Sequence, residues 1–358
     1  AGRTFPAGAD IKELELAAQG KSAGGPDMHA RFQRIEDSPK PVVVAVHGTC
    51  LGGGCELAMS GHYRVAAPGT LVGQPEVNLG IIPGAEGTQR LPRLVGVAAA
   101  IDLCVSGKPI KAPQALEMGL IDKVIEGDLR AGAIAFAKEV AARGAHLKTR
   151  DRSDRLGSAT ENVPLFVAGK AQAAKIRKHQ VAPIAAVEAI AAATKLDFEE
   201  GCLEERRLFD GLLKGEQARA MVHAFFAERA VSKLPGITKD TKVYEIRSAA
   251  IIGAGTMGQG ISMALANAGI PVRIKDTSQE ALDKGVAGIK KNYASSVAKG
   301  RFTQEVMDQR VALIQTQLDY AGFETADLII EAAFESMELK KKIYAEIDAI
   351  AKPDCVLA

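Results

Sequence analysis

The chain has 358 residues, 47% hydrophobic and 25% charged, which is the composition of a folded globular protein of about two domains. Lys and Arg total 45 against 43 Asp and Glu, so the net charge of +2 gives no overall basic surface for nucleic acid. No apolar run approaches the roughly 18 residues of a membrane span. The five cysteines lack metal-type spacing and are too few for a disulfide scaffold, which favours a reducing compartment.

Short apolar runs broken by glycine-rich turns fill the first third of the chain. The β-branched run at 41–46 predicts a buried strand. It leads into a glycine-rich turn at 48–54 and then a helix from about Cys55 to Ser60. A second glycine-containing turn at 5–10 ends in Asp10, a residue suited to capping the helix that follows.

The middle of the chain is predominantly helical. Residues 130–143 are Ala-rich, and the pattern from about 165 to 230 is helical with few strand runs. The charges at 204–207 (EERR) indicate a solvent-exposed helix face. Residues 233–237 (KLPGI) break the helix and predict a linker.

Strands and helices alternate in the last third. Strands are predicted at 247–252, 271–276 and 327–331, which implies parallel βαβ units. The sequence opens without Met or a signal-peptide pattern, and its last residues read as the start of a strand. We therefore expect an internal piece of a longer protein.

Three glycines and two glutamates form the first group of candidate functional residues. Gly52, Gly53 and Gly54 lie where a strand meets a helix, so their amides can approach a ligand and stabilise an oxyanion. Glu56 and Glu76 are candidates for acid–base catalysis beside such a site. The alternative for an arbitrary glutamate is structural, with Glu56 favouring the helix start and Glu76 on a surface loop.

Four stretches of the chain resemble the enoyl-CoA hydratase (crotonase) superfamily, in the order found there: FPAGADI, PVVVAVHGTCLGGGCELAMS, GQPEVNLGIIPGAEGTQRLPRLVG and SGKPIKAPQALEMGLIDKV. The resemblance implies that Ala9 and Gly53 donate the amides that hold the thioester oxygen. It implies that Glu56 activates water and Glu76 delivers a proton to Cα, while the Gly84 amide helps to hold the water.

The chain departs from that family in two places. Glu86 stands where many members have a small residue, which implies an altered loop near the acyl tail. The strands that the family has before Phe5 are missing, and with them part of the expected CoA-binding surface.

A dinucleotide fingerprint is the second candidate site. Gly253, Gly255 and Gly258 form a GxGxxG that follows a predicted strand and opens a helix, as the motif requires. Asp276 ends the next strand about 20 residues on, where an acid binds the ribose hydroxyls and favours NAD over NADP. The structural alternative is a glycine turn with an unrelated strand-end acid.

The residues around this motif resemble 3-hydroxyacyl-CoA dehydrogenase, most specifically in DYAGF and ADLIIEAAFESMELKKKIYAEIDAIAKPDCVLA. The resemblance implies that the NAD contacts include Met257, Asp276, Ala333, Phe334, Glu335 and Lys340. The catalytic Ser-His-Glu residues of that family would lie beyond Ala358, so this chain is expected to form the NAD-binding half only.

Together these observations predict an α/β chain: a crotonase-like ββα spiral domain at 1–160, a helical linker region at 161–243, and an incomplete Rossmann-type doubly wound parallel sheet at 244–358. The resemblance implies a bifunctional fatty-acid β-oxidation enzyme that hydrates enoyl-CoA thioesters and uses NAD to oxidise the product. The alternatives are an enoyl-CoA isomerase with a vestigial dehydrogenase, and a non-catalytic acyl-CoA or nucleotide-binding module.

Partners and location follow from the same resemblance. An acyl-CoA substrate is expected, with no nucleic acid and no membrane span, and association with a thiolase is a further expectation. No histidine has metal-ligand spacing, so no metal site is predicted. A bacterial cytoplasmic location is expected, and a peroxisomal one is the alternative because a C-terminal signal would lie outside this chain.

Overall fold

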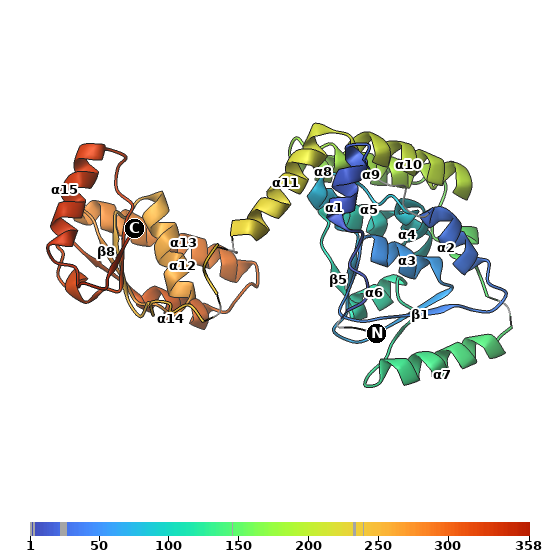
Figure 1. Cartoon of the computed structure of the whole chain (residues 1–358), viewed down its shortest axis with the longest axis horizontal. Helices are drawn as coiled ribbons and strands as arrows, with labels where there is room; N and C mark the ends of the chain where they lie inside the picture. Colours follow the sequence, from blue (N-terminus) through green and yellow to red (C-terminus); the bar gives the residue numbers. More distant parts are fainter. Residues whose placement is uncertain (1, 3, 22–26, 145, 232–233, 239) are drawn as a thin grey trace. The chain divides into compact units, whose positions relative to one another are not determined.

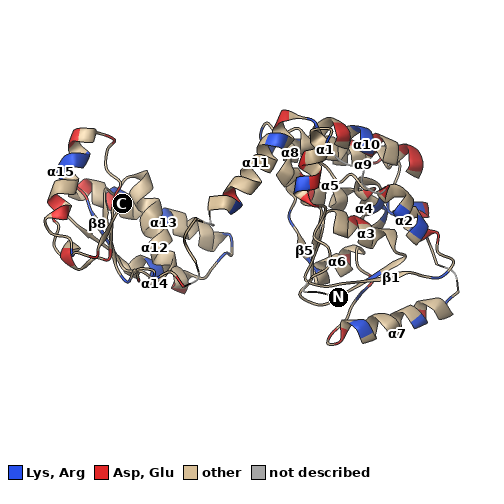
Figure 2. Cartoon of the chain, in the orientation of Figure 1, with Lys and Arg blue, Asp and Glu red and all other residues tan. Residues whose placement is uncertain are grey.

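The computed structural model describes residues 2, 4–21, 27–144, 146–231, 234–238 and 240–358. The chain divides into two compact units, residues 1–236 and 237–358 (Figure 1). Lys233 of the predicted linker lies outside the described residues. Acidic and basic residues are interspersed over both units (Figure 2). No helix among the described residues is long and apolar enough to span a membrane.

Two small sheets form the frame of the first unit. One is parallel in the order β1-β3-β6, and the other has the order β2-β4-β5 with an antiparallel β4–β5 pair. The strands are β1 (Val43–Val46), β2 (Thr49–Leu51), β3 (Tyr63–Ala66), β4 (Leu71–Gly73), β5 (Ile110–Lys111) and β6 (Lys123–Val124). The strand predicted at 41–46 is therefore present as β1, and the predicted turn at 48–54 contains the short strand β2.

Helices surround these sheets and supply most of the apolar core. Its buried residues come chiefly from α3, α4, α5 and α9, and apolar residues of α10 pack against them. The helices are α1 (Ile11–Ala18), α2 (Met28–Glu36), α3 (Gly53–Ser60), η1 (Glu76–Leu79), α4 (Gly87–Val95), α5 (Val97–Ser106), α6 (Ala112–Met118), α7 (Leu129–Ala142), η2 (Thr149–Asp151), α8 (Val163–Ile176), α9 (Ala182–Ala192), α10 (Phe198–Leu213) and α11 (Glu216–Val231). Asp10 caps α1 as predicted, because its carboxylate accepts a hydrogen bond from the Lys12 amide at 2.9 Å.

One sequence-based interpretation of this region is wrong. The charged stretch at 204–207 was expected to lie on a solvent-exposed helix face, and Arg206 and Arg207 are exposed. Glu205, however, is only 1% exposed. Because α10 turns once in 3.6 residues and packs against α4 and α9, consecutive charged residues cannot all face solvent.

The second unit is a five-stranded parallel sheet in the order β11-β10-β7-β8-β9. Its elements are β7 (Ala249–Ile252), α12 (Thr256–Asn267), β8 (Val272–Lys275), α13 (Gln279–Ala298), α14 (Gln304–Ala312), β9 (Ile314–Gln317), η3 (Phe323–Thr325), β10 (Leu328–Glu331), α15 (Met337–Asp348) and β11 (Val356–Leu357). Numbered along the chain, the order is the 3-2-1-4-5 of a doubly wound fold.

Helices cover both faces of this sheet. Alternate residues of the buried strand β7 point to opposite sides, as the strand period requires. Ala250 joins a core cluster with Ile343 and Ile347 of α15, whereas Ile251 joins one with Leu282 and Ile289 of α13. The predicted doubly wound α/β architecture is confirmed.

Close backbone contacts require the first and third glycines of the GxGxxG turn, Gly253 and Gly258. A Cβ on Gly253, whose φ is +108°, would lie 2.5 Å from the Ala332 carbonyl oxygen. A Cβ on Gly258 would lie 1.9 Å from the Gly253 carbonyl oxygen, so α12 begins directly against the end of β7. At Gly255 a Cβ would meet no atom within 4 Å, which leaves space beside the helix N-terminus.

Gly258→Ala should destabilise the second unit by about 1–3 kcal/mol, because the added methyl forces α12 away from β7. Gly260→Ala is the matched control. Gly260 lies in the same helix, is exposed and has open space around it, so alanine there should stabilise the unit by up to about 1 kcal/mol. Urea denaturation followed by circular dichroism measures both, and equal effects would contradict the packing argument.

Candidate functional site

Glu56 lies in the first turn of α3, at the end of a tight strand-to-helix connection. β2 ends at Leu51, and Gly52 turns the chain with a φ of +54° before α3 begins. The Glu56 side chain is only 3% exposed. Its Oε1 accepts hydrogen bonds from the backbone amides of Ala85 at 2.8 Å and Gly87 at 3.0 Å.

Glu76 and Ala9 lie at the same junction. A Cβ placed on Gly52 would be 2.7 Å from Oε1 of Glu76. A Cβ placed on Gly53 would be 3.6 Å from the Ala9 amide nitrogen and 3.8 Å from Oε2 of Glu56. The structure therefore brings Ala9, Gly53, Glu56 and Glu76 together around the glycines that join β2 to α3.

The glycines permit this assembly because the backbone of residues 5–10 passes close to α3. A Cβ on Gly54 would lie 1.8 Å from the Pro6 carbonyl oxygen, a distance that no side chain can tolerate. The Phe5 amide donates to the His47 carbonyl at 2.9 Å and anchors this segment beside β2. The glycine-rich sequence thus reflects backbone-to-backbone packing as well as access for a ligand.

Burial raises the pKa values of both Glu56 and Glu76. It raises the pKa of Glu56 to about 7, and the two amide hydrogen bonds partly offset the shift. The pKa of Glu76 is raised well above its usual value by burial and by the charge of Glu56. Two neighbouring carboxyls with raised pKa values can hold one proton between them near neutral pH, as acid–base pairs do.

A polar neighbour also holds Glu76. With its side-chain amide turned to donate, Gln74 lies 3.1 and 3.2 Å from the two carboxylate oxygens of Glu76. The two residues flank Pro75 at the start of η1. Sequence reasoning did not single out Gln74, because a lone amide in a loop carries no signal of its own.

Gly84, predicted to help hold a water molecule, packs against an aromatic ring. A Cβ on Gly84 would lie 2.4 Å from the ring of Phe209 in α10. The close contact explains why this position is a glycine. The water-holding role of its amide stays a prediction.

Glu86 follows in an unusual conformation within a buried ion-pair network. Its φ is +70°, a left-handed value rare for a residue with a side chain. Its carboxylate contacts His29 and pairs with Arg90 at 2.5 Å, and Arg90 also pairs with Glu36 at 2.7 Å. The departure from a small residue noted in the sequence is therefore accommodated by partners of opposite charge.

Potential metal-ligand atoms of His29, Glu86 and Cys202 all lie within 4.8 Å of one another. The surrounding chemistry explains this cluster without an ion. Arg90 already neutralises the Glu86 carboxylate, and burial raises the pKa of the Cys202 thiol, which opposes the thiolate that a metal requires. We treat the cluster as part of the ion-pair network.

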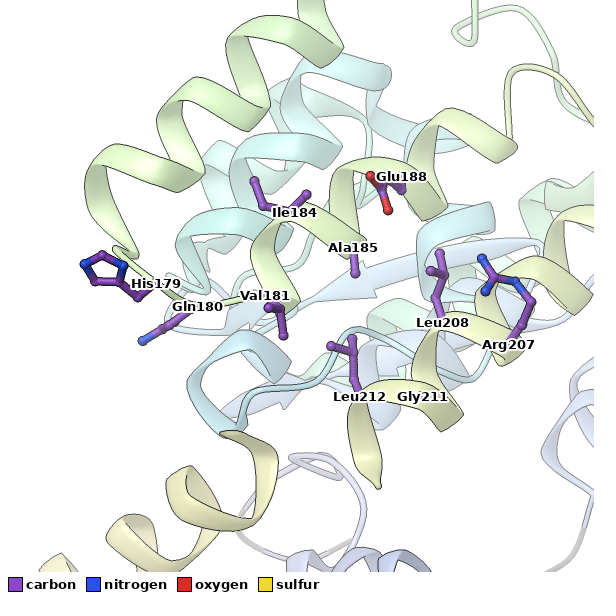
Figure 3. A pocket seen from close by; sticks show the side chains of 10 residues that line it. All are labelled: His179, Gln180, Val181, Ile184, Ala185, Glu188, Arg207, Leu208, Gly211 and Leu212. Atoms are coloured by element: carbon purple, nitrogen blue, oxygen red, sulfur yellow. The ribbon is translucent and has the colours of Figure 1, made fainter. Parts of the chain in front are cut away.

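A cavity of about 510 Å³ lies away from the two glutamates, between α9 and α10 (Figure 3). Its lining is mainly apolar and includes Val181, Ile184, Leu208 and Leu212, with Arg207 at one side. α10 therefore borders the cavity with Leu208 and Leu212, while Glu205 and Phe209 of the same helix contact residues 84–88.

In the second unit, Asp276 binds the glycine-rich turn. It follows β8, and its Oδ2 accepts a hydrogen bond from the Ala254 amide at 2.7 Å, while Oδ1 accepts from the Thr277 amide at 2.6 Å. The preceding Lys275 places its ammonium 4.6 Å from the centre of the Tyr320 ring. The two neighbouring side chains thus have separate partners.

The other predicted cofactor residues lie at the carboxyl ends of the strands. Met257 lies in the first turn of α12 after β7 and is 68% exposed, and Phe334 follows β10 and is 80% exposed. The Ala333 amide donates to Oε1 of Glu331 at 2.6 Å. Ligands of doubly wound sheets bind at this edge, where the strand order reverses between β7 and β10.

Lys340 is held by two acidic residues. Its ammonium lies 2.5 Å from Oε2 of Glu331 and 3.4 Å from Oε2 of the exposed Glu335. Sequence reasoning placed Glu331 only at the end of a strand. The sequence does contain a signal for this ion pair. Glu331 ends a strand, and Lys340 lies one helical turn into the next helix.

Both units match known families. Residues 1–159 match the family model for enoyl-CoA hydratase/isomerase, and residues 248–358 match the model for the NAD-binding domain of 3-hydroxyacyl-CoA dehydrogenase. A peroxisomal fatty acid beta-oxidation multifunctional protein of Arabidopsis thaliana is 39% identical over 90% of this chain and 45% of its own length.

Two further relatives match nearly the whole chain. The peroxisomal bifunctional enzyme of Danio rerio is 37% identical over 99% of this chain and 48% of its own length. A glyoxysomal fatty acid beta-oxidation multifunctional protein of Cucumis sativus is 34% identical over 99% of this chain and 50% of its own length. The chain spans about half the length of the curated relatives it matches.

Proposed function

We propose that this chain hydrates trans-2-enoyl-CoA to 3-hydroxyacyl-CoA and takes part in the NAD-dependent oxidation of that product. The proposal starts from the two family matches, which make the chain a fusion of a crotonase-family hydratase/isomerase region with the NAD-binding region of a 3-hydroxyacyl-CoA dehydrogenase. The observation that carries the hydratase proposal is the placement of Glu56 and Glu76 beside Ala9 and Gly53. The predicted segments 1–160, 161–243 and 244–358 would then be the hydratase core, its helical extension and the cofactor half.

The residues fit the chemistry of hydration. Adding water to an α,β-unsaturated thioester passes through an enolate-like oxyanion, which the amides of Ala9 and Gly53 would stabilise. Ionised Glu56 would take a proton from water, and protonated Glu76 would deliver one to Cα. The amides of Ala85 and Gly87 hold Oε1 of Glu56, which leaves Oε2, the oxygen nearer Gly53, for the water. Gly84 would contribute its amide to the same water.

The turn around Gly253, Gly255 and Gly258 fits NAD. The space beside Gly255 at the start of α12 admits a pyrophosphate, and the Asp276 carboxylate keeps acceptor capacity for the ribose hydroxyls after binding two amides. Met257, Ala333, Phe334, Glu335 and Lys340 would line the rest of the site. NAD, when bound, supplies the hydride acceptor for oxidation of the 3-hydroxyacyl group.

Two alternatives remain distinguishable by assay. An enoyl-CoA isomerase with a vestigial dehydrogenase would convert cis-3-enoyl-CoA faster than it hydrates trans-2-enoyl-CoA. A non-catalytic binding module would bind CoA thioesters without turnover of crotonyl-CoA. The raised pKa values of Glu56 and Glu76 favour an acid–base catalyst over a binding module.

Location and assembly belong to the same proposal. The relatives described above are named as peroxisomal or glyoxysomal, which supports a peroxisomal location. The bacterial cytoplasm and an association with a thiolase stay predictions from the sequence resemblance. Cell fractionation and co-purification with a thiolase would test them.

Glu56→Gln and Glu76→Gln should each lower the rate of crotonyl-CoA hydration by at least about 100-fold, because each removes one proton-transfer group. CoA-thioester binding should persist, since neither substitution changes the shape of the site. Glu139→Gln, at an exposed glutamate paired with Arg143, is the control and should leave the rate unchanged. Near-normal turnover in both active-site variants would rule out the hydratase mechanism.

Hydration should slow as the pH falls through about 7, because Glu56 must be ionised to accept a proton from water and its pKa lies at about 7. The raised pKa of Glu76 keeps that residue protonated to higher pH, so kcat/KM should pass through a maximum on the alkaline side. The profile reports the pair rather than either residue alone. An acidic limb near the ordinary glutamate value of about 4.3 would contradict the burial argument.

Asp276→Ala should weaken NAD binding and reduce the preference for NAD over NADP, because the carboxylate repels a 2′-phosphate. Asp283→Ala, at an exposed acid on α13, is the matched control and should change neither affinity. Calorimetric titration of both cofactors provides the measurement. Wild-type protein that binds both cofactors equally, or an unchanged preference in the Asp276 variant, would overturn the assignment.

A further inference from the structure

Glu205 is a buried carboxylate from the helical segment that contacts the start of α4. It is 1% exposed and lies on α10. Its carboxylate accepts hydrogen bonds from the backbone amides of Glu86 at 2.6 Å and Thr88 at 2.7 Å, and from the Thr88 hydroxyl at 2.5 Å. A buried acid far away in the sequence thus binds the loop that also binds Glu56.

The amides of residues 85–88 alternate between two carboxylates. Those of Ala85 and Gly87 donate to Glu56, and those of Glu86 and Thr88 donate to Glu205. Both carboxylates therefore hold the same short piece of backbone from different sides. If Glu205 released its two amides, the loop would lose the contacts that keep the Ala85 and Gly87 amides directed at Glu56.

α10 holds this loop at a second point. Phe209 lies one helical turn after Glu205, and its ring packs where any side chain on Gly84 would clash. Between these two contacts, Glu86 adopts its left-handed φ of +70°. A conformation of that kind is strained and persists only where the surroundings enforce it.

Glu205 lies among other acidic and thiol groups. Its titratable neighbours are Glu56 on α3, Glu76 on η1, Cys104 on α5, Glu86 at the start of α4 and Cys202 on α10 itself. Burial and the charge of Glu56 raise the pKa of Glu205 to about 8. The hydrogen bonds from the amides of Glu86 and Thr88 and from the Thr88 hydroxyl partly offset this rise in the pKa of Glu205.

We propose that Glu205 is a positioning residue for the hydratase site, which holds residues 85–88 so that their amides orient Glu56. This inference rests on the proposed hydratase function, because it assigns Glu56 the role of the base. It also makes the helical segment after residue 160 part of the catalytic unit rather than a spacer.

The test measures crotonyl-CoA hydration by the whole protein carrying Glu205→Ala, Glu205→Gln or Glu204→Gln. Glu205→Ala should lower kcat by about 10-fold to 100-fold with a change of less than about threefold in KM, because the base is misplaced while the substrate contacts stay. Glu205→Gln keeps a carbonyl acceptor and the side-chain shape, so its kcat should fall between those of Glu205→Ala and the wild type. Glu204→Gln, whose side chain pairs with Arg207 at the surface, should match the wild type.

A double variant separates positioning from simple stability. If Glu205 acts through Glu56, Glu205→Ala should lower the residual rate of Glu56→Gln by less than about twofold. Equal losses in both backgrounds, or a normal kcat in Glu205→Ala, would overturn the positioning role. If Glu205→Ala does not fold, the test relies on Glu205→Gln. A normal kcat in Glu205→Gln would then overturn the positioning role. Wild type and Glu56→Gln that hydrate equally well would refute the hydratase function, whatever the Glu205 variants do.

Discussion

The backbone amides of Ala85, Glu86, Gly87 and Thr88 are shared alternately between two buried carboxylates, one on α3 and one on α10. Burying a carboxylate is costly unless hydrogen bonds compensate for the lost water. Here the amides of one short segment supply hydrogen bonds to two carboxylates, and the same hydrogen bonds fix the conformation of the segment. The position of α4, the left-handed conformation of Glu86 and the orientation of Glu56 all depend on this arrangement.

In the second unit, too, carboxylates fix loops by accepting hydrogen bonds from backbone amides, here with one such amide for each carboxylate–loop pair. Asp276 binds the Ala254 amide of the glycine-rich turn, and Glu331 binds the Ala333 amide of the loop after β10. In both cases an acid at the end of a strand fixes a loop at the carboxyl edge of the sheet. Loops without large side chains need such anchors, because glycine and alanine provide little packing of their own.

The fold class and the clustering of the candidate residues of each site could be predicted because they depend on local patterns. The GxGxxG at 253–258, the strand before it and Asp276 lie within one βαβ unit, and the spacing together with the strand-to-helix context predicts them. Glu56 follows the glycines directly, Glu76 lies in the next loop along the chain, and the resemblance assigns roles to both. Glu205 could not be found in this way. It sits among charged residues on an amphipathic helix, and only tertiary packing decides which of them faces inward.

The contacts of α10 have a consequence for how the proposed hydratase region could be moved between proteins. The family match ends at residue 159, well before α10 begins at Phe198. A gene fragment cut at that point would lack Glu205, the acceptor for the amides of Glu86 and Thr88. It would also uncover the apolar residues that α9 and α10 bury. As a unit of recombination, the proposed hydratase region therefore extends through α10, beyond the part that carries its recognisable motifs.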